Sequence, residues 1–255
     1  MVVTDGPVLT WLGRFLWPFL RVTGLFLTAP VYGSAMIPMR VKAILAAALA
    51  GALACWLPDL PAFPADPIIA IYQGIIQIGF GAAIGIAMQV VVASIAGLGE
   101  VAGLAMGLSF AELQFQGASG TTQVLYDIMS WAALLGFMAL GGPIWLFAAV
   151  AHSFQTGTAG LAPGAWPALM ALGGSVITTA VMLAVPVMAV SLTINITVGL
   201  LTVFSPQLNL LTIGFPLLIL GGLSILTASL ADLPSSIEHL LATGVRTIAT
   251  MVPHG

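Results

Sequence analysis

The residues of this sequence that could do chemistry are a few ionisable side chains inside long apolar runs. Arg14, Arg21, Glu100, Glu112 and Asp127 all lie in such runs. A charged side chain inside a membrane is costly unless it is paired or hydrated. Arg14 and Arg21 are seven positions apart and therefore share a face of the first predicted helix. Two interpretations stay open: the binding site or proton relay of a solute transporter, and contacts to neighbouring helices or subunits, which we favour.

A second kind of chemistry is catalysis by a serine. Gly117–Gly120 reads GASG, which resembles the GxSG around the serine of rhomboid intramembrane proteases, with Ser119 as nucleophile and His152 or His239 as base. A four-residue match rich in small residues is common by chance, and the stretch fits a turn equally well. The sequence contains no HExxH motif, Walker loop or cysteine cluster. We therefore expect a protein that is not an enzyme and that has no metal or other cofactor.

The composition predicts an integral membrane protein. Of the 255 residues, 60% are hydrophobic and only 5% are charged, against about 25% charged residues in an ordinary soluble domain. The net charge is −3 and no basic patch is present, which argues against a nucleic-acid partner. Cys55 excludes an internal disulfide and is expected to be a small packed side chain.

The apolar runs predict an all-α fold. They cover roughly 7–33, 42–57, 68–112, 122–151, 166–204 and 208–231, with polar or proline-rich loops at 58–67 and 152–167. A backbone in lipid must satisfy its own hydrogen bonds, so these runs are helices. As one helix, 68–112 would extend about 65 Å, twice the roughly 30 Å hydrocarbon core. We expect kinked helices and helical hairpins, with a turn or kink at Ala96–Glu100 and a bend at Pro186.

Small residues predict close helix packing. Gly81 and Gly85 are four positions apart, and Gly99, Gly103 and Gly107 repeat this spacing. Glycines at this spacing allow two helix backbones to approach each other closely. The partner helix would belong either to this chain or to another subunit.

The C-terminal part predicts an amphipathic helix over 235–252. Ser235 and Glu238 have the spacing of a capping box, and apolar residues recur on one face from Ile237 to Ile248. This helix would lie on the membrane, dock on a partner, or fold back on its own bundle.

Five segments in order resemble the FliR family of flagellar export proteins, whose injectisome counterpart is SctT. They are WPFLRVTGLFLTAPVYG at 17–33, IPMRVK at 37–42, GEVAGLAMGLSF at 99–110, HSFQTGTAG at 152–160 and SPQLNLLTIGFPLLILGGL at 205–223. The resemblance covers nearly the whole chain, and the IPMRVK and MGLSF stretches favour the flagellar member.

The resemblance implies a fold, a function and partners. It implies one membrane-embedded export-gate domain over 1–255, with a FliP-like part at roughly 1–165 fused to a FliQ-like part at roughly 166–231. One copy would close a ring of FliP-like and FliQ-like subunits. FlhB-like and FlhA-like proteins would adjoin this gate in the bacterial inner membrane, at the flagellar basal body. Unfolded flagellar proteins would pass through its centre.

The resemblance also implies a role for the polar stretch that interrupts the apolar pattern after residue 108. The segment after MGLSF would project into the pore and plug it; a plain connecting loop at 112–121 is the alternative. The implied plug residues are Met106, Phe110, Leu113, Phe115, Gly117 and Gly120. Arg14, Arg21, Glu100 and Asp127 would make buried polar contacts to partner subunits. A solute transporter would instead require an inverted repeat, and we find no convincing internal repeat.

Overall fold

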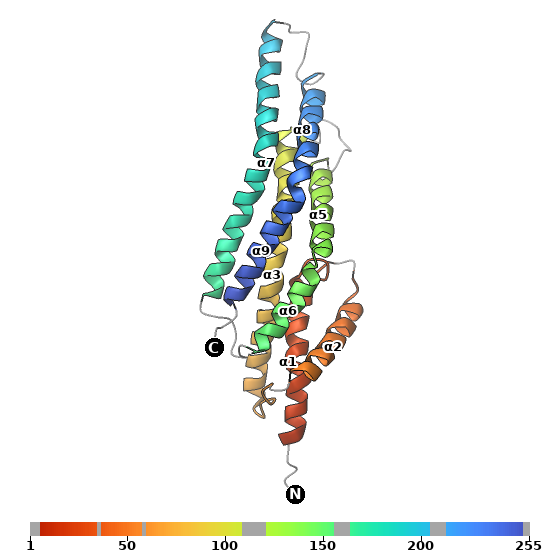
Figure 1. Cartoon of the computed structure of the whole chain (residues 1–255), viewed down its shortest axis with the longest axis vertical. Coiled ribbons are helices and arrows are strands. Elements are labelled where there is room, and N and C mark those ends of the chain that lie inside the picture. The colour runs from red at the N-terminus through yellow and green to blue at the C-terminus, as the bar shows by residue number, and fades with distance from the viewer. Residues whose placement is uncertain are drawn as a thin grey trace. The chain divides into compact units, whose positions relative to one another are not determined.

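A computed structural model of the chain describes residues 6–34, 37–57, 60–108, 121–155, 164–204 and 213–251. These residues form helices and no β-strand (Figure 1), which confirms the all-α prediction. The helices are α1 (Gly6–Thr28), α2 (Met39–Trp56), α3 (Pro67–Ala105), α5 (Thr121–Ala139), α6 (Gly142–Gln155), α7 (Ala165–Phe204), α8 (Phe215–Ser229) and α9 (Leu233–Met251), with a short 3-10 helix η2 (Leu230–Asp232).

The helices belong to two compact units. The first unit combines residues 1–90, 141–172 and 241–255, and the second combines 91–140 and 173–240. The long helices α3, α7 and α9 each contribute residues to both units. The division into FliP-like and FliQ-like parts near residue 165 stays a prediction, since it concerns a likeness to other proteins.

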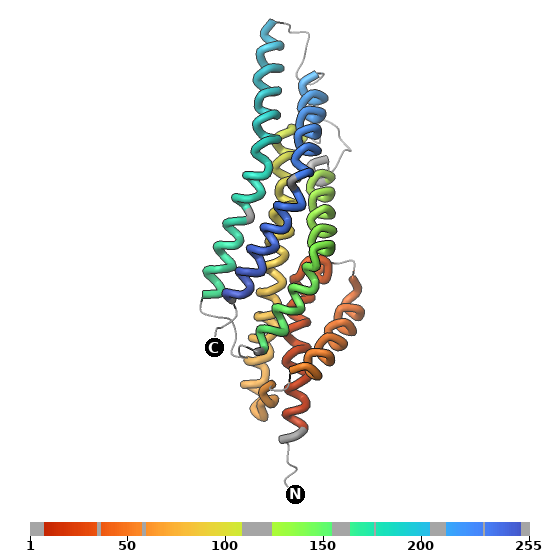
Figure 2. Tube along the Cα trace, in the orientation of Figure 1, coloured from red at the N-terminus to blue at the C-terminus, as the bar shows by residue number. Residues whose placement is uncertain are grey.

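The longest helices run without a break where the sequence predicted one. Helix α3 has 39 residues and α7 has 40, and Figure 2 shows α3 as one continuous helix. The turn predicted at Ala96–Glu100 is therefore wrong as a chain reversal. Pro186 lies inside α7, in the middle of the predicted run. Within 96–100, Gly97 and Gly99 allow Ala180 and Leu125 to pack closely against α3, and the helix continues through them.

The chain bends sharply at two other places. Residues 124–139 and 142–154 meet at 61°, and 215–229 and 233–250 meet at 63°. Gly141 has a φ of +75° at the first bend, a conformation that favours glycine. At the second bend η2 separates α8 from α9, and the tighter 3-10 winding changes the direction of the chain. The prediction of bent helix pairs is confirmed, although their places are new.

Among the described residues, three helices are long and apolar enough to cross a membrane: α2, α3 and α7. Each of the two bent pairs could be a further span, which gives up to five. The integral membrane prediction is consistent with this number of apolar helices.

In the first unit, the segment 60–64 packs against α1. Phe63 donates its backbone N–H to the Leu9 carbonyl oxygen at 2.9 Å, and the rings of Trp17 and Phe63 stack 5.3 Å apart. Pro61 accepts a hydrogen bond from Trp17 Nε1 at 3.0 Å. Cys55, by contrast, lies exposed on α2, so the prediction that it is packed is wrong. Its position in an apolar run did not show which face of α2 it occupies.

Helix α9 folds back on the chain, which was one of the three predicted positions for the tail. Ile237, Leu240, Leu241 and Ile248 form its buried stripe. In the second unit Ile237 lies against Gly136 of α5. The helix starts at Leu233 as a continuation of η2, so Ser235 lies inside the first turn rather than at the predicted cap.

Candidate functional site

A fully buried arginine ties three helices of the first unit together. Arg21 of α1 donates Nε–H to Gln77 Oε1 of α3 at 2.8 Å and Nη1–H to Ser153 Oγ of α6 at 2.6 Å. Its guanidinium carbon lies 4.4 Å from the centre of the Phe80 ring and 3.8 Å from that of Phe154. One side chain of the first predicted helix is therefore fixed by residues that are far away in the sequence.

The charge of Arg21 is stabilised by neutral groups. No carboxylate among the described residues pairs with Arg21, and its Nη2 atom has no hydrogen-bond partner there. The faces of the two phenylalanine rings carry partial negative charge and attract the cation. The Ser153 hydroxyl donates a hydrogen bond to the Val150 carbonyl oxygen at 2.6 Å, so the Ser153 oxygen can accept a hydrogen bond from Arg21. The arrangement is a structural tie and offers no titratable partner for a proton relay within the described residues.

The glycines of α3 bring its backbone against α1 just beside Arg21. A Cβ on Gly81 would lie 2.8 Å from the carbonyl carbon of Arg21 and closer still to its oxygen. A Cβ on Gly85 would lie 2.8 Å from the backbone nitrogen of Ala29. Thr28 Oγ1 donates to the Ala82 carbonyl oxygen at 2.9 Å across the same contact. The first glycine pair therefore packs within this chain.

The second glycine series lies in the second unit. A Cβ on Gly99 would lie 2.8 Å from the Leu125 carbonyl carbon and 2.8 Å from Met129 Cγ, both on α5. Gly103 is buried. Gly107 has a φ of +73°, the left-handed conformation that commonly ends a helix. Helix α3 thus uses this series for close packing along its length and for its termination.

Met106 is buried at the end of α3. It is 1% exposed, and its side chain lies flat on Gly222 of α8, where a Cβ would be 2.5 Å from Met106 Cγ. The remaining predicted plug residues lie outside the described residues: Phe110, Leu113, Phe115, Gly117 and Gly120. Ser119 and Glu112 lie outside them as well. The plug therefore stays a prediction.

The other ionisable candidates are more exposed than Arg21. Glu100 on α3 and Asp127 on α5 are exposed in the second unit, and Arg14 on α1 is partly exposed in the first. A contact to partner subunits stays a prediction for all three. His152 is exposed as well.

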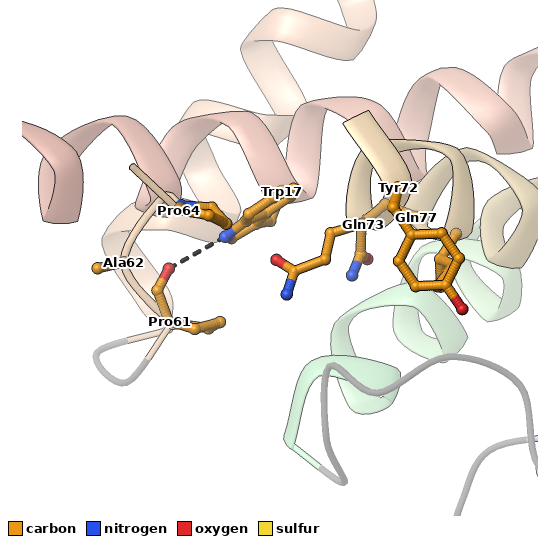
Figure 3. A pocket seen from close by; sticks show the side chains of 8 residues that line it. Trp17, Pro61, Ala62, Pro64, Tyr72, Gln73 and Gln77 are labelled. Atoms are coloured by element: carbon orange, nitrogen blue, oxygen red, sulfur yellow. Dashed lines mark hydrogen bonds between the residues drawn. The ribbon is translucent and has the colours of Figure 1, made fainter. Parts of the chain in front are cut away.

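A pocket of about 390 Å³ lies in the first unit, beside the start of α3 (Figure 3). Its walls come from Trp17 of α1, from the segment 61–64, and from the first turns of α3. Tyr72, Gln73 and Gln77 supply its polar groups. Among the described residues that line it, none is a carboxylate, a histidine or a cation.

The sequence analysis did not identify the residues that bind Arg21, nor Gly222 as the residue against which Met106 packs. Gln77 is a polar residue in an otherwise apolar run, which was a usable signal. Ser153 and Gly222 carry no such signal, because small residues are frequent throughout the chain. No group of three or more His, Cys, Asp or Glu residues that could hold a metal ion occurs in the described ranges.

The fold and the site together define a class of protein: a helical membrane protein whose buried polar groups tie helices together. A comparison with family models matches residues 12–244 to "Bacterial export proteins, family 1". The chain belongs to this family of export proteins, the FliR family. The protease and transporter alternatives receive no support from this match.

Curated relatives align with almost the whole length of this chain. The flagellar biosynthetic protein FliR of Escherichia coli (strain K12) is 35% identical over 255 residues, which cover 98% of this chain and 97% of the relative. The protein of the same name from Pectobacterium carotovorum subsp. carotovorum is 33% identical over 95% of this chain and 94% of its own length. The one from Aquifex aeolicus (strain VF5) is 25% identical over 84% of each. The predicted family, and the assignment to flagellar protein export, are confirmed.

Proposed function

We propose that this chain is the membrane subunit that joins FliP-like and FliQ-like subunits in the flagellar type III export gate. The observation that carries the proposal is the 35% identity to a flagellar biosynthetic protein across 98% of the chain. The gate would reside in the bacterial inner membrane at the base of the flagellum, where FlhB-like and FlhA-like proteins would adjoin it. Its action is the conformational gating of an unfolded polypeptide, without bond chemistry.

The length of α7 supports a place inside a larger assembly. Met170 near its start is 77% exposed and Phe204 at its end is 84% exposed. These residues are separated by about 51 Å along the helix, well above the roughly 30 Å of a hydrocarbon core. One end of this apolar helix therefore extends beyond the lipid tails and requires a protein cover. Neighbouring subunits of a helical gate would provide that cover.

The exposed carboxylates support the same proposal. Glu100 and Asp127 lie on helices that are otherwise strongly apolar. A carboxylate facing lipid is costly, whereas one that meets a cation or a backbone donor of another subunit is stabilised. We therefore assign Glu100 and Asp127 to contacts with partner subunits. Arg21 is instead held by residues of its own chain.

The segment that follows α3 is proposed as the plug of the channel. It combines two phenylalanines with glutamines and glycines in a chain that is apolar on both sides. Bulky apolar side chains exclude ions through many weak contacts, and these contacts can re-form after a polypeptide has passed. Glycine allows the backbone to change conformation at low cost.

A proton-leak assay on the assembled gate tests the plug. Shortening the segment within 112–119 is expected to leave assembly intact and to raise the proton permeability of cells or vesicles that contain the gate. Shortening the chain within 156–163, part of the loop predicted from the sequence, by the same number of residues is the matched control, and it should not raise the permeability. Normal ion tightness in the assembled 112–119 variant would remove the plug from the proposal.

A further inference from the structure

The end of α3 is held by two successive residues that meet one face of α8. The side chain of Met106 covers Gly222, where a Cβ would lie 2.5 Å from Cγ, 2.8 Å from Cε and 2.9 Å from Sδ. A Cβ on Gly107 would lie 3.2 Å from Cε1 of the Phe215 ring. Phe215 and Gly222 are seven residues apart, two turns of α8, and therefore lie on the same face.

The seat for Met106 exists because α8 has no side chain there. Met106 is 1% exposed and Gly222 is buried. A larger residue at position 222 would occupy the volume that the thioether fills. Methionine suits such a shallow seat because its flexible, polarizable chain follows an irregular surface.

A neighbouring face of α8 packs against α7. Gly221, the residue before Gly222, faces α7, where a Cβ would lie 3.7 Å from Val190 Cγ1 and also against Ile194. The two neighbouring glycines thus turn one toward α7 and the other toward the end of α3. Helix α8 is therefore also in contact with α7 beside the position where it receives Met106.

The backbone at this point changes direction immediately. Met106 N–H still donates to the Ala102 carbonyl oxygen at 3.0 Å, as in a helix, whereas Gly107 N–H donates to Leu104 at 3.0 Å. With a φ of +73°, Gly107 ends the helix in a left-handed conformation. Fixing Met106 on Gly222 thus sets the point and the direction in which the chain leaves α3.

From this geometry we infer that Met106 and Gly222 form a permanent anchor, which positions the start of the chain after α3 and stays closed while a polypeptide passes. This inference rests on the proposed function, since its effect is measured as ion tightness and export. Met106 is then a positioning residue at the base of the plug.

Size-swap variants test the anchor in the complete, co-expressed gate. Gly222→Leu is expected to displace Met106. The fraction of gates in which Met106 packs on position 222 should fall roughly ten- to a hundredfold, the effect of exposing one large apolar side chain. The assembled gate should then leak protons. Gly79→Leu is the matched control on α3, where a Cβ would have nothing within 4 Å. In the double variant Gly222→Leu with Met106→Ala, the new leucine side chain occupies the space that the methionine side chain leaves. This variant should therefore be proton-tight again.

A reversible cross-link tests whether the anchor is permanent. Because Met106 Cγ is one C–C bond of ~1.5 Å from its Cβ, Met106→Cys and Gly222→Cys would place their Cβ atoms within about 4 Å, which suits a disulfide. The background is Cys55→Ser, since Cys55 is exposed. The oxidised gate should export at the rate of the reduced gate and remain ion-tight.

Three outcomes would overturn the anchor: no disulfide under oxidant, export that stops on oxidation and returns on reduction, or a Gly222→Leu gate as tight as the Gly79→Leu gate. If Gly222→Leu does not assemble, the cross-link still decides the question. Failure of the unchanged chain to assemble with its partners or to support export would instead refute the proposed function. The two failures are therefore distinguishable.

Discussion

Replacing one glycine of α3 by alanine should separate two helices and disturb a buried charge. Gly81→Ala would place a methyl group 2.8 Å from the carbonyl carbon of Arg21 and closer to its oxygen. Relief to an ordinary contact of about 3.5 Å requires a shift of at least about 0.7 Å between α1 and α3. The atoms in the way are backbone, so no side chain can move aside.

The loss of stability expected for Gly81→Ala follows from the hydrogen bonds that Arg21 makes across the contact between α1 and α3. Its Nε lies 2.8 Å from Gln77 Oε1, and the same shift stretches this distance to the limit of a hydrogen bond. A hydrogen bond to a charged group contributes about 1.5–3 kcal/mol. We expect Gly81→Ala to lower the free energy of unfolding by about 1.5–3 kcal/mol, since Ser153 and the two rings still contact Arg21.

The assay is equilibrium unfolding of the purified chain in mixed micelles, with Gly79→Ala as the control. Gly79 lies two residues away on the same helix, and a Cβ there would have nothing within 4 Å. The control should be neutral or more stable by up to ~1 kcal/mol, because alanine favours the helix. Equal stabilities of the two variants would refute the close contact of α1 and α3 and the role given to Gly81.

Three further predictions concern other described residues. Arg21→Lys should destabilise the chain by about 2 kcal/mol or more in the same assay, because an ammonium group cannot donate to Gln77 and Ser153 while lying between two rings; wild-type stability would contradict the tie. Gly107→Ala should cost about 1–2 kcal/mol, since its φ of +73° is strained for a residue with a Cβ; an unchanged midpoint of unfolding would contradict that conformation. Cys55 is exposed, so a maleimide should label it in detergent without prior unfolding, whereas protection until denaturation would contradict its position on α2.

The helical class was predictable because lipid leaves a backbone few alternatives. The positions of the bends could not be predicted from the sequence. Glycines at 97 and 99 resembled a break in the sequence, yet inside α3 they admit Ala180 and Leu125 as close neighbours. A glycine within a helix costs only about 1 kcal/mol, which packing offsets. The break at Gly141 depends on a positive φ, which glycine permits but which its place in the sequence does not predict.

The charged residues show the same limit. Arg21 and Glu100 looked alike in the sequence, as single charges in apolar runs. The structure buries one completely and exposes the other, because Phe80 and Phe154 come together around Arg21 from two helices. Periodicity identifies the face on which a residue lies, whereas the identity of the facing helix depends on the whole fold. Family resemblance supplied the function, and local physics alone would have left a transporter open.

The most direct test of the central claim is the mass of the assembled complex. This chain, carrying a tag, would be co-expressed with FliP-like and FliQ-like proteins from the same source, purified in detergent, and weighed by native mass spectrometry. The export-gate account predicts one large assembly that contains both partners and a single copy of this chain. A monomer or small homo-oligomer, with both partners expressed and folded, would contradict it.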